Sequence, residues 1–281
     1  MSVSILEKLT AIPREIVIGL VIIAMIIPTL NPLGLPLMTG QMAKDWYNFV
    51  EDTPAGSVVL FDIGFGSGGY PSLGPATIAV FHQFFDNDLK VIIMATALEG
   101  SMMYPLIMDE VKPETKHGAV YGDDYVFLGY IAGVQTAMAG VLGNLPAIIS
   151  NDYLGTPIGQ IDVLDGIGGA QDIDLVAYLT TAGGTSEGWV YQGSSAYGKD
   201  VLGGFLSMMT TSMKPYYDTG QLLGVIDGVK GAADMEFLTG YPGDAIQSSD
   251  VLSFSQTLVV IFVLIGNISY WASRGSRKEE I

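Results

Sequence analysis

Two uncharged apolar stretches lie near the ends of the chain, on either side of a long region in which short apolar and polar runs alternate. The later stretch, residues 252–271, reads LSFSQTLVVIFVLIGNISYW and contains twenty residues without a charge. At about 1.5 Å per residue, a helix of this length crosses a hydrocarbon layer of about 30 Å. We therefore expect residues 252–271 to form a C-terminal transmembrane helix.

The earlier stretch, residues 16–30, contains fifteen uncharged residues and is short for a membrane span. Apolar residues continue after it, although Pro28, Pro32 and Pro36 bend or end a helix. A cleaved signal peptide is the alternative, because basic residues come first, but no clear small-x-small cleavage site follows. We expect residues 16–38 to be a retained transmembrane anchor with a proline-rich exit.

The region between the anchors, residues 39–251, predicts one α/β domain. Apolar runs rich in Val, Ile and Leu alternate with helix-like segments, as in a parallel sheet with crossover helices. The expected strands are 58–63, 91–96, 125–129, 175–180 and 201–208, and the expected helices are 75–85, 102–111, 132–145 and a poorly defined segment near 186–197. The predicted fold is thus a mostly parallel, open, Rossmann-like sheet of about five strands, flanked by the two transmembrane helices.

Two other segments bear on this organisation. Residues 44–52, KDWYNFVED, predict a short helix whose aromatic residues lie either at the membrane interface or against the domain. Residues 130–149 are uncharged and long enough for a third span. A third span would place the basic ends of the chain on opposite sides of the membrane, so we expect a buried helix there instead.

The distribution of basic residues predicts the orientation. Lys8 and Arg14 precede the first apolar stretch, and three basic residues follow the last. The positive-inside rule then places residues 1–15 and 272–281 in the cytoplasm. We therefore expect a two-pass protein of the cell membrane with its main domain outside the cytoplasm.

Composition narrows the functional classes. The net charge is −17, and most of the acidic residues lie between the anchors, so binding to nucleic acid is disfavoured. The acidic surface indicates either ordinary solvation or a cation-rich or acidic external medium. The chain has no Cys and only two His, which excludes thiolate sites and most zinc sites built from His and Cys. We expect no metal and no cofactor.

A glycine-rich motif follows the first expected strand. Gly64, Gly66 and Gly69 match the G-x-G-x-x-G pattern that brings a phosphate to a helix N-terminus in dinucleotide sites. However, Tyr70 and Pro71 follow directly, so no helix can begin at the second glycine as such a site requires. The second strand also ends without an acidic residue for a ribose. We interpret the motif as a flexible turn.

Small hydroxyl residues, glycines and a few carboxylates occupy the C-terminal ends of the expected strands. In a parallel sheet these ends meet at one edge, where ligands of such folds bind. The edge could hold a small polar ligand or a cation, or its residues could only cap turns and helices. The candidate ligand-binding residues are Asp62, Gly64, Gly66, Ser67, Glu99, Ser101, Thr181, Thr185, Glu187 and Thr211.

Residues 218–238 predict the last helix before the second anchor. Within it, four small residues recur at intervals of four, and on a helix they would form one ridge. The domain's own sheet or another copy of the chain could pack closely against such a ridge. The members of this candidate packing or oligomer surface are Gly220, Gly224, Gly228 and Ala232.

The sequence lacks a recognisable catalytic constellation. His82 lies in an apolar helical segment, His117 lies in a polar loop, and neither is near a serine in a G-x-S-x-G elbow. Catalytic residues are therefore not assigned. The remaining enzymatic hypothesis is a Ser/Thr hydrolase that would use Ser67 or Thr185 with Glu99 or Glu187.

Residues 219–236, TGQLLGVIDGVKGAADME, resemble a signature of an uncharacterised family of bacterial and archaeal membrane proteins. Residues 61–64 and 90–94 are similar to the same family. The resemblance implies two anchors and a Rossmann-like external domain, and it brings no activity with it.

Together these features favour a non-catalytic scaffold or assembly subunit over an enzyme. Its expected partners are the lipid bilayer and either further copies of the chain or other membrane proteins. A receptor or solute/cation-binding module that uses the strand ends is the alternative, and the hydrolase is the second alternative.

Overall fold

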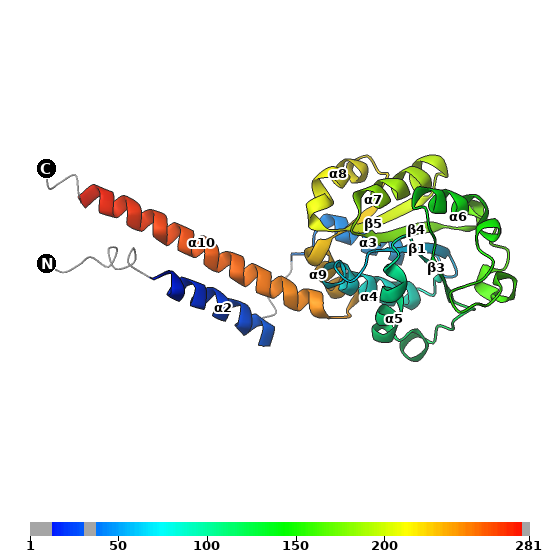
Figure 1. Cartoon of the computed structure of the whole chain (residues 1–281), viewed down its shortest axis with the longest axis horizontal. Helices are drawn as coiled ribbons and strands as arrows, with labels where there is room; N and C mark the ends of the chain where they lie inside the picture. Colours follow the sequence, from blue (N-terminus) through cyan, green and yellow to red (C-terminus); the bar gives the residue numbers. More distant parts are fainter. Residues whose placement is uncertain (1–12, 31–37, 277–281) are drawn as a thin grey trace. The chain divides into compact units, whose positions relative to one another are not determined.

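The computed structural model describes residues 13–30 and 38–276 (Figure 1). The chain divides into two compact units. The larger, here called the α/β unit, comprises residues 37–246, and the smaller, the helical unit, comprises residues 1–36 and 247–281. The predicted tails and proline-rich exit fall largely on residues 1–12, 31–37 and 277–281, which lie outside the described residues.

The α/β unit is built around a six-stranded parallel sheet with the order β3-β2-β1-β4-β5-β6. The α/β class and the parallel, Rossmann-like sheet are thus confirmed. The expected number of strands was too low by one, because the last strand lies inside the segment predicted as a helix. The strands are β1 (Val58–Gly64), β2 (Lys90–Ala95), β3 (Tyr125–Tyr130), β4 (Leu175–Thr180), β5 (Asp200–Phe205) and β6 (Gly224–Asp227).

Both faces of the sheet are buried, which explains the unbroken apolar runs of the central strands. In β1, Val59 and Phe61 belong to the core on one face, and Leu60 belongs to the core on the other. Successive side chains of a strand point to opposite faces, so a strand that is covered on both sides needs apolar residues at every position.

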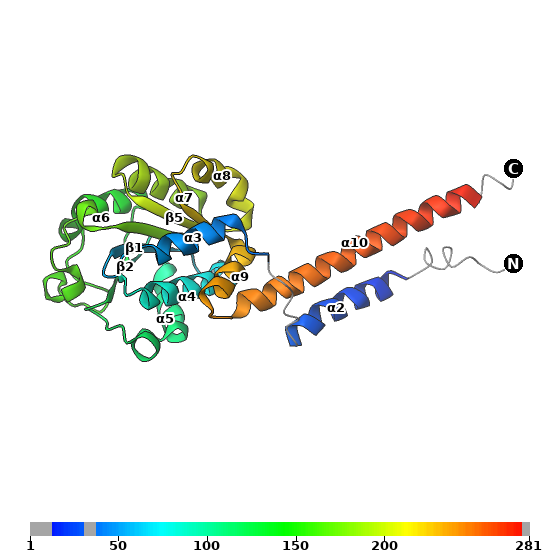
Figure 2. The same ribbon diagram turned by 180° about the vertical axis from the view of Figure 1, so that it is seen from behind.

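Helices form a layer on each face of this sheet, as Figures 1 and 2 show. One layer contains α3 (Gln41–Glu51), α4 (Tyr70–Asp86), α5 (Gly100–Val111) and α9 (Gly228–Thr239). The other contains α6 (Gln135–Ile148), α7 (Gly183–Trp189) and α8 (Thr210–Asp218). Short helical turns complete the unit: η1 (Pro113–His117), η2 (Ile158–Gln160), η3 (Asp162–Leu164), η4 (Ala170–Asp172), η5 (Val190–Ala196) and η6 (Ser207–Met209).

The single helix predicted for residues 218–238 is wrong. Instead, α8 ends at Asp218, β6 follows after a turn, and α9 begins only at Gly228. The proposed ridge of small residues therefore does not exist as one surface. Gly220 has a φ of +77° in the turn, and Gly228 has a φ of +52° at the junction of β6 and α9. These left-handed conformations favour glycine for local reasons, and the interval of four is not a helical repeat.

The helical unit contains α2 (Arg14–Leu30) and most of α10 (Asp244–Ser276). Within residues 13–30 and 38–276, residues 244–268 of α10 form the one helical stretch that is long and apolar enough to cross a membrane. At 17 residues, α2 is shorter, and the side-chain amide of Gln247 in α10 donates to the carbonyl oxygen of Thr29 at its end. One membrane-spanning helix is thus supported, and the two-pass topology remains a prediction.

Candidate functional site

A depression of about 510 Å³ opens at the C-terminal edge of the sheet, where the strand order reverses between β1 and β4. The glycine-rich loop after β1 forms one wall, and Glu99 and Thr181, which follow β2 and β4, contribute to the others. Ligands of open α/β sheets bind at this kind of position. The candidate residues at the strand ends are therefore expected to meet at this depression.

The glycine-rich loop already holds a carboxylate of its own chain. The backbone N–H and the Oγ of Ser67 donate to Oε2 of Glu99 at 3.0 and 3.2 Å. A Cβ atom on Gly66 would lie 2.1 Å from the same oxygen, so glycine is required for this approach. α4 begins at Tyr70, directly after the loop. The carboxylate thus occupies the concave side of the loop, where a phosphate lies in dinucleotide sites.

Asp62 is fully buried at the end of β1, and both of its oxygens are used within the fold. Oδ1 accepts the backbone N–H of Thr96 at 2.8 Å, while Oδ2 accepts Oγ1 of Thr96 at 2.7 Å and Nε1 of Trp189 at 2.6 Å. Burial raises the pKa of Asp62 to about 6, and these hydrogen bonds oppose the rise. Asp62 thus links β1 to the loop after β2 and to α7.

The other candidate residues are divided between packing and exposed positions. A Cβ atom on Gly64 would lie 2.8 Å from Oγ1 of Thr180, which donates to the carbonyl oxygen of Gly64. Thr185 is buried and the Oγ of Ser101 is buried without a partner among the described residues. Glu187 and Thr211 are exposed on α7 and α8. The depression therefore brings together the glycine-rich loop, Glu99 and Thr181 from the candidate set.

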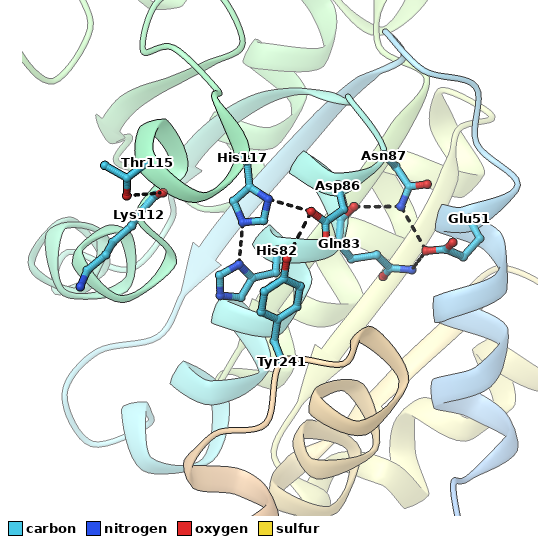
Figure 3. Close-up of polar contacts among 9 residues, drawn as sticks. All are labelled: Glu51, His82, Gln83, Asp86, Asn87, Lys112, Thr115, His117 and Tyr241. Carbon is cyan, nitrogen blue, oxygen red and sulfur yellow. Dashed lines mark hydrogen bonds and ion pairs between the residues drawn. The ribbon is translucent and has the colours of Figure 1, made fainter.

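A second polar cluster was missed by the sequence analysis, which treated its two histidines separately. Nδ1 of His82 lies 2.7 Å from Nε2 of His117, and Nδ1 of His117 lies 2.8 Å from Oδ1 of Asp86 (Figure 3). Tyr241 stacks on His82 with ring centroids 3.9 Å apart, and its hydroxyl donates to Asp86 at 3.3 Å. Asp86 is four residues after His82 on α4, which was the one local signal that the two share a helix face.

The cluster is arranged as a hydrogen-bonded chain from His82 through His117 to Asp86, as in a proton relay. Among the described residues, no hydrogen bond joins it to the candidate Ser67. Burial, together with the charge of Lys116, lowers the pKa of His82 to about 4. The Oγ of Ser67 instead contacts Glu99. In the part of the chain that the structure describes, no group of three or more His, Asp or Glu is arranged to hold a metal ion.

Comparisons with protein-family models, curated proteins and solved structures found no match for this chain. The resemblance of residues 219–236 to two-anchor membrane proteins therefore stays a prediction.

Proposed function

We propose that this protein is a membrane-tethered assembly subunit, a non-catalytic scaffold whose α/β unit contacts further copies or partner membrane proteins. The observation that carries the proposal is the apolar surface of α10. Its residues Val260 and Leu264 are 56% and 55% exposed within the chain, as are many of their apolar neighbours. A surface of this extent needs a cover of lipid or protein, and its length suits a bilayer.

A second anchor and a defined orientation belong to the same proposal. In α2, Ile18, Ile22 and Ile26 are about half exposed and would face lipid in the same way. Basic residues lie outside both apolar stretches, toward the chain ends. By the positive-inside rule, both ends are cytoplasmic and the α/β unit is extracytoplasmic.

An exposed apolar stripe beside α5 supports the assembly role and replaces the glycine ridge as its basis. Leu98, Met102 and Leu106 are 69%, 66% and 52% exposed and are spaced by four residues. Met102 and Leu106 lie one turn apart on one side of α5, and Leu98 lies two residues before the start of the helix at Gly100. Single exposed apolar residues are ordinary, whereas a row of them favours contact with another protein.

Native mass spectrometry and crosslinking of the full chain in lipid nanodiscs test this role. We expect a mass of two or more copies, or of the chain with a second membrane protein. The double substitution Met102→Glu and Leu106→Glu should reduce the associated fraction, because it places charge in the stripe. Thr115→Glu, an exposed position outside the stripe, is the control. A strictly monomeric unaltered chain would contradict the proposal.

A solute- or cation-binding role at the strand ends is the second candidate, and the depression beside Glu99 favours it. Glu99 and Thr181 offer oxygen atoms at the point where such sheets bind ligands. Thermal-shift measurements with Ca²⁺, Mg²⁺, sugars and amino acids test it. We expect a rise in melting temperature with one of these that Glu99→Gln abolishes, and a uniform lack of stabilisation would exclude the role.

A further inference from the structure

A second cavity, of about 340 Å³, lies in the α/β unit beside the His82 cluster and shares no lining residue with the strand-end depression. Its wall includes His82 from α4, Glu110 from α5, Lys116 from η1, and Tyr241 and Asp244 after α9. Its volume is within the range of about 300–1,000 Å³ that is typical of small-molecule sites. The proposed scaffold role does not use this cavity.

The hydrogen bonds of the cluster leave one nitrogen of His82 as an acceptor. The carboxylate of Asp86 can only accept, so Nδ1 of His117 donates to it. When both rings are neutral, Nε2 of His117 must then accept the N–H at Nδ1 of His82. The tautomer of His82 is thereby fixed, and its Nε2 carries a lone pair.

His82 is only 2% exposed, yet its Nε2 makes no hydrogen bond among the described residues. In Figure 3 this nitrogen points away from both His117 and Tyr241. Because His82 lines the cavity, a ligand there that donates a hydrogen bond would engage this acceptor.

The charges around the cavity select the kind of donor. Three carboxylates, those of Glu110, Glu236 and Asp244, line it with one cation, Lys116. Glu236 is already used, because it accepts the backbone N–H groups of Ala245 and Ile246 at 2.9 and 2.8 Å. Glu110 and Asp244 remain, so the cavity favours a positively charged ligand.

We propose that this cavity binds a small organic ammonium ion. Its N–H groups donate to Nε2 of His82 and to the carboxylates of Glu110 and Asp244, and its carbon body lies against the rings of Tyr70 and Tyr241, which also line the cavity. Aromatic faces attract ammonium groups as well as covering apolar atoms. The lowered pKa of His82 keeps the imidazole neutral at pH 7, so it does not repel the cation.

A series of four-carbon compounds tests the charge preference on the full chain in detergent at pH 7. Isothermal titration calorimetry is carried out with putrescine, 1,4-butanediol and succinate, which are respectively a dication, a neutral diol and a dianion. We expect binding of putrescine alone. Equal binding of the diol, or no binding of putrescine at millimolar concentration, would overturn the proposal.

Nuclear magnetic resonance distinguishes binding of putrescine in this cavity from non-specific binding to the acidic surface of the protein. The chain has only two His, so ¹⁵N-histidine labelling gives few signals, which His117→Gln assigns. We expect putrescine to shift the ¹⁵N signal of the unprotonated Nε2 of His82 upfield, as acceptance of a hydrogen bond does, with a smaller change at His117. Putrescine binding that leaves the His82 signal unmoved would refute the site.

A pair of substitutions on α5 provides the matched control. Glu110→Gln should weaken putrescine binding about three- to five-fold, which corresponds to a partly exposed ion pair. Asp109→Asn removes the same charge from the neighbouring position, which does not line the cavity, and should leave the affinity unchanged. An equal loss of affinity in both variants would show that putrescine responds to the overall negative charge of the protein, and it would contradict the proposal.

Discussion

The position of Asp62 suggested a ligand-binding carboxylate, but its surroundings are those of a structural residue. Its place at the end of β1 is where ligand-binding acids are found in such sheets, yet three hydrogen bonds from Thr96 and Trp189 saturate it. All three donors point at the carboxylate, so the group acts as a hub between elements distant in the sequence. At the scale of single residues, the candidate edge is therefore held together by internal contacts.

The substitution Asp62→Asn tests this role. The amide NH₂ would face a donor from Thr96 or Trp189 and leave at least one buried donor unpaired. We expect the free energy of unfolding to fall by about 2–3 kcal/mol. Urea unfolding of the full chain in detergent measures it, with Asp165→Asn at an exposed position as control. Unchanged stability would show that the hydrogen bonds contribute little.

His82 predicts a dependence of stability on pH. Its pKa is lowered from 6.5 to about 4 by burial first, so between these values the unfolded chain binds more protons than the folded one. Its contribution is therefore complete above pH 6.5 and is lost as the pH falls toward 4, by up to about 3 kcal/mol. Asp62 acts in the opposite sense, because its pKa is raised from 3.8 to about 6.

Melting temperatures of the unaltered chain and of His82→Phe at pH 7 and pH 5 isolate this contribution. Phenylalanine keeps an aromatic ring against Tyr241 but does not titrate. We expect the variant to be less stable at pH 7 and its deficit to shrink at pH 5, since only the unaltered chain is penalised by protonation. A deficit that is the same at both pH values would contradict the assignment.

At the scale of elements, α3 and β6 depend on a close approach at one glycine. A Cβ atom on Gly224 would lie 2.4 Å from both N and Cα of Trp46, which is fully buried. Backbone atoms cannot move aside as a flexible side chain can. The glycine that the sequence suggested for a helix ridge instead allows a helix to lie directly on an edge strand.

We expect Gly224→Ala to destabilise the α/β unit by about 1–3 kcal/mol, because it overpacks this contact. Thermal unfolding in detergent measures the change. Gly183→Ala is the matched control, because no atom lies within 4 Å of the added methyl group. If both variants melt at the temperature of the unaltered chain, α3 and β6 are not tightly coupled.

Five of the six strands could be predicted because a strand that is covered on both faces leaves an unbroken apolar run. β6 could not, since four residues with a glycine among them carry too little pattern and the spacing of glycines imitated a helix. The depression could be placed from the parallel topology alone. The pairing of His82 with His117 could not, because a separation of 35 residues is set by packing and leaves no local trace.

At the scale of the whole molecule, the topology is directly testable because the chain contains no Cys. A single cysteine at Asp165→Cys reports on the α/β unit, and one at Lys278→Cys reports on the C-terminal tail. A maleimide that cannot cross membranes should label the first on intact cells and the second only after lysis. Labelling of the tail on intact cells would reverse the proposed orientation.

The carboxylate of Glu99 occupies the position in the glycine-rich loop that an anionic ligand would take. It fills the cradle of the glycine-rich loop and satisfies the amide that a phosphate would otherwise engage. The substitution Glu99→Ala would remove the acceptor of the Ser67 amide. Inorganic phosphate should then bind weakly to the loop, whereas it should not bind to the unaltered chain. The glycine-rich loop thus binds a carboxylate of its own chain, and this single side chain determines whether the amide of Ser67 is available to another anion.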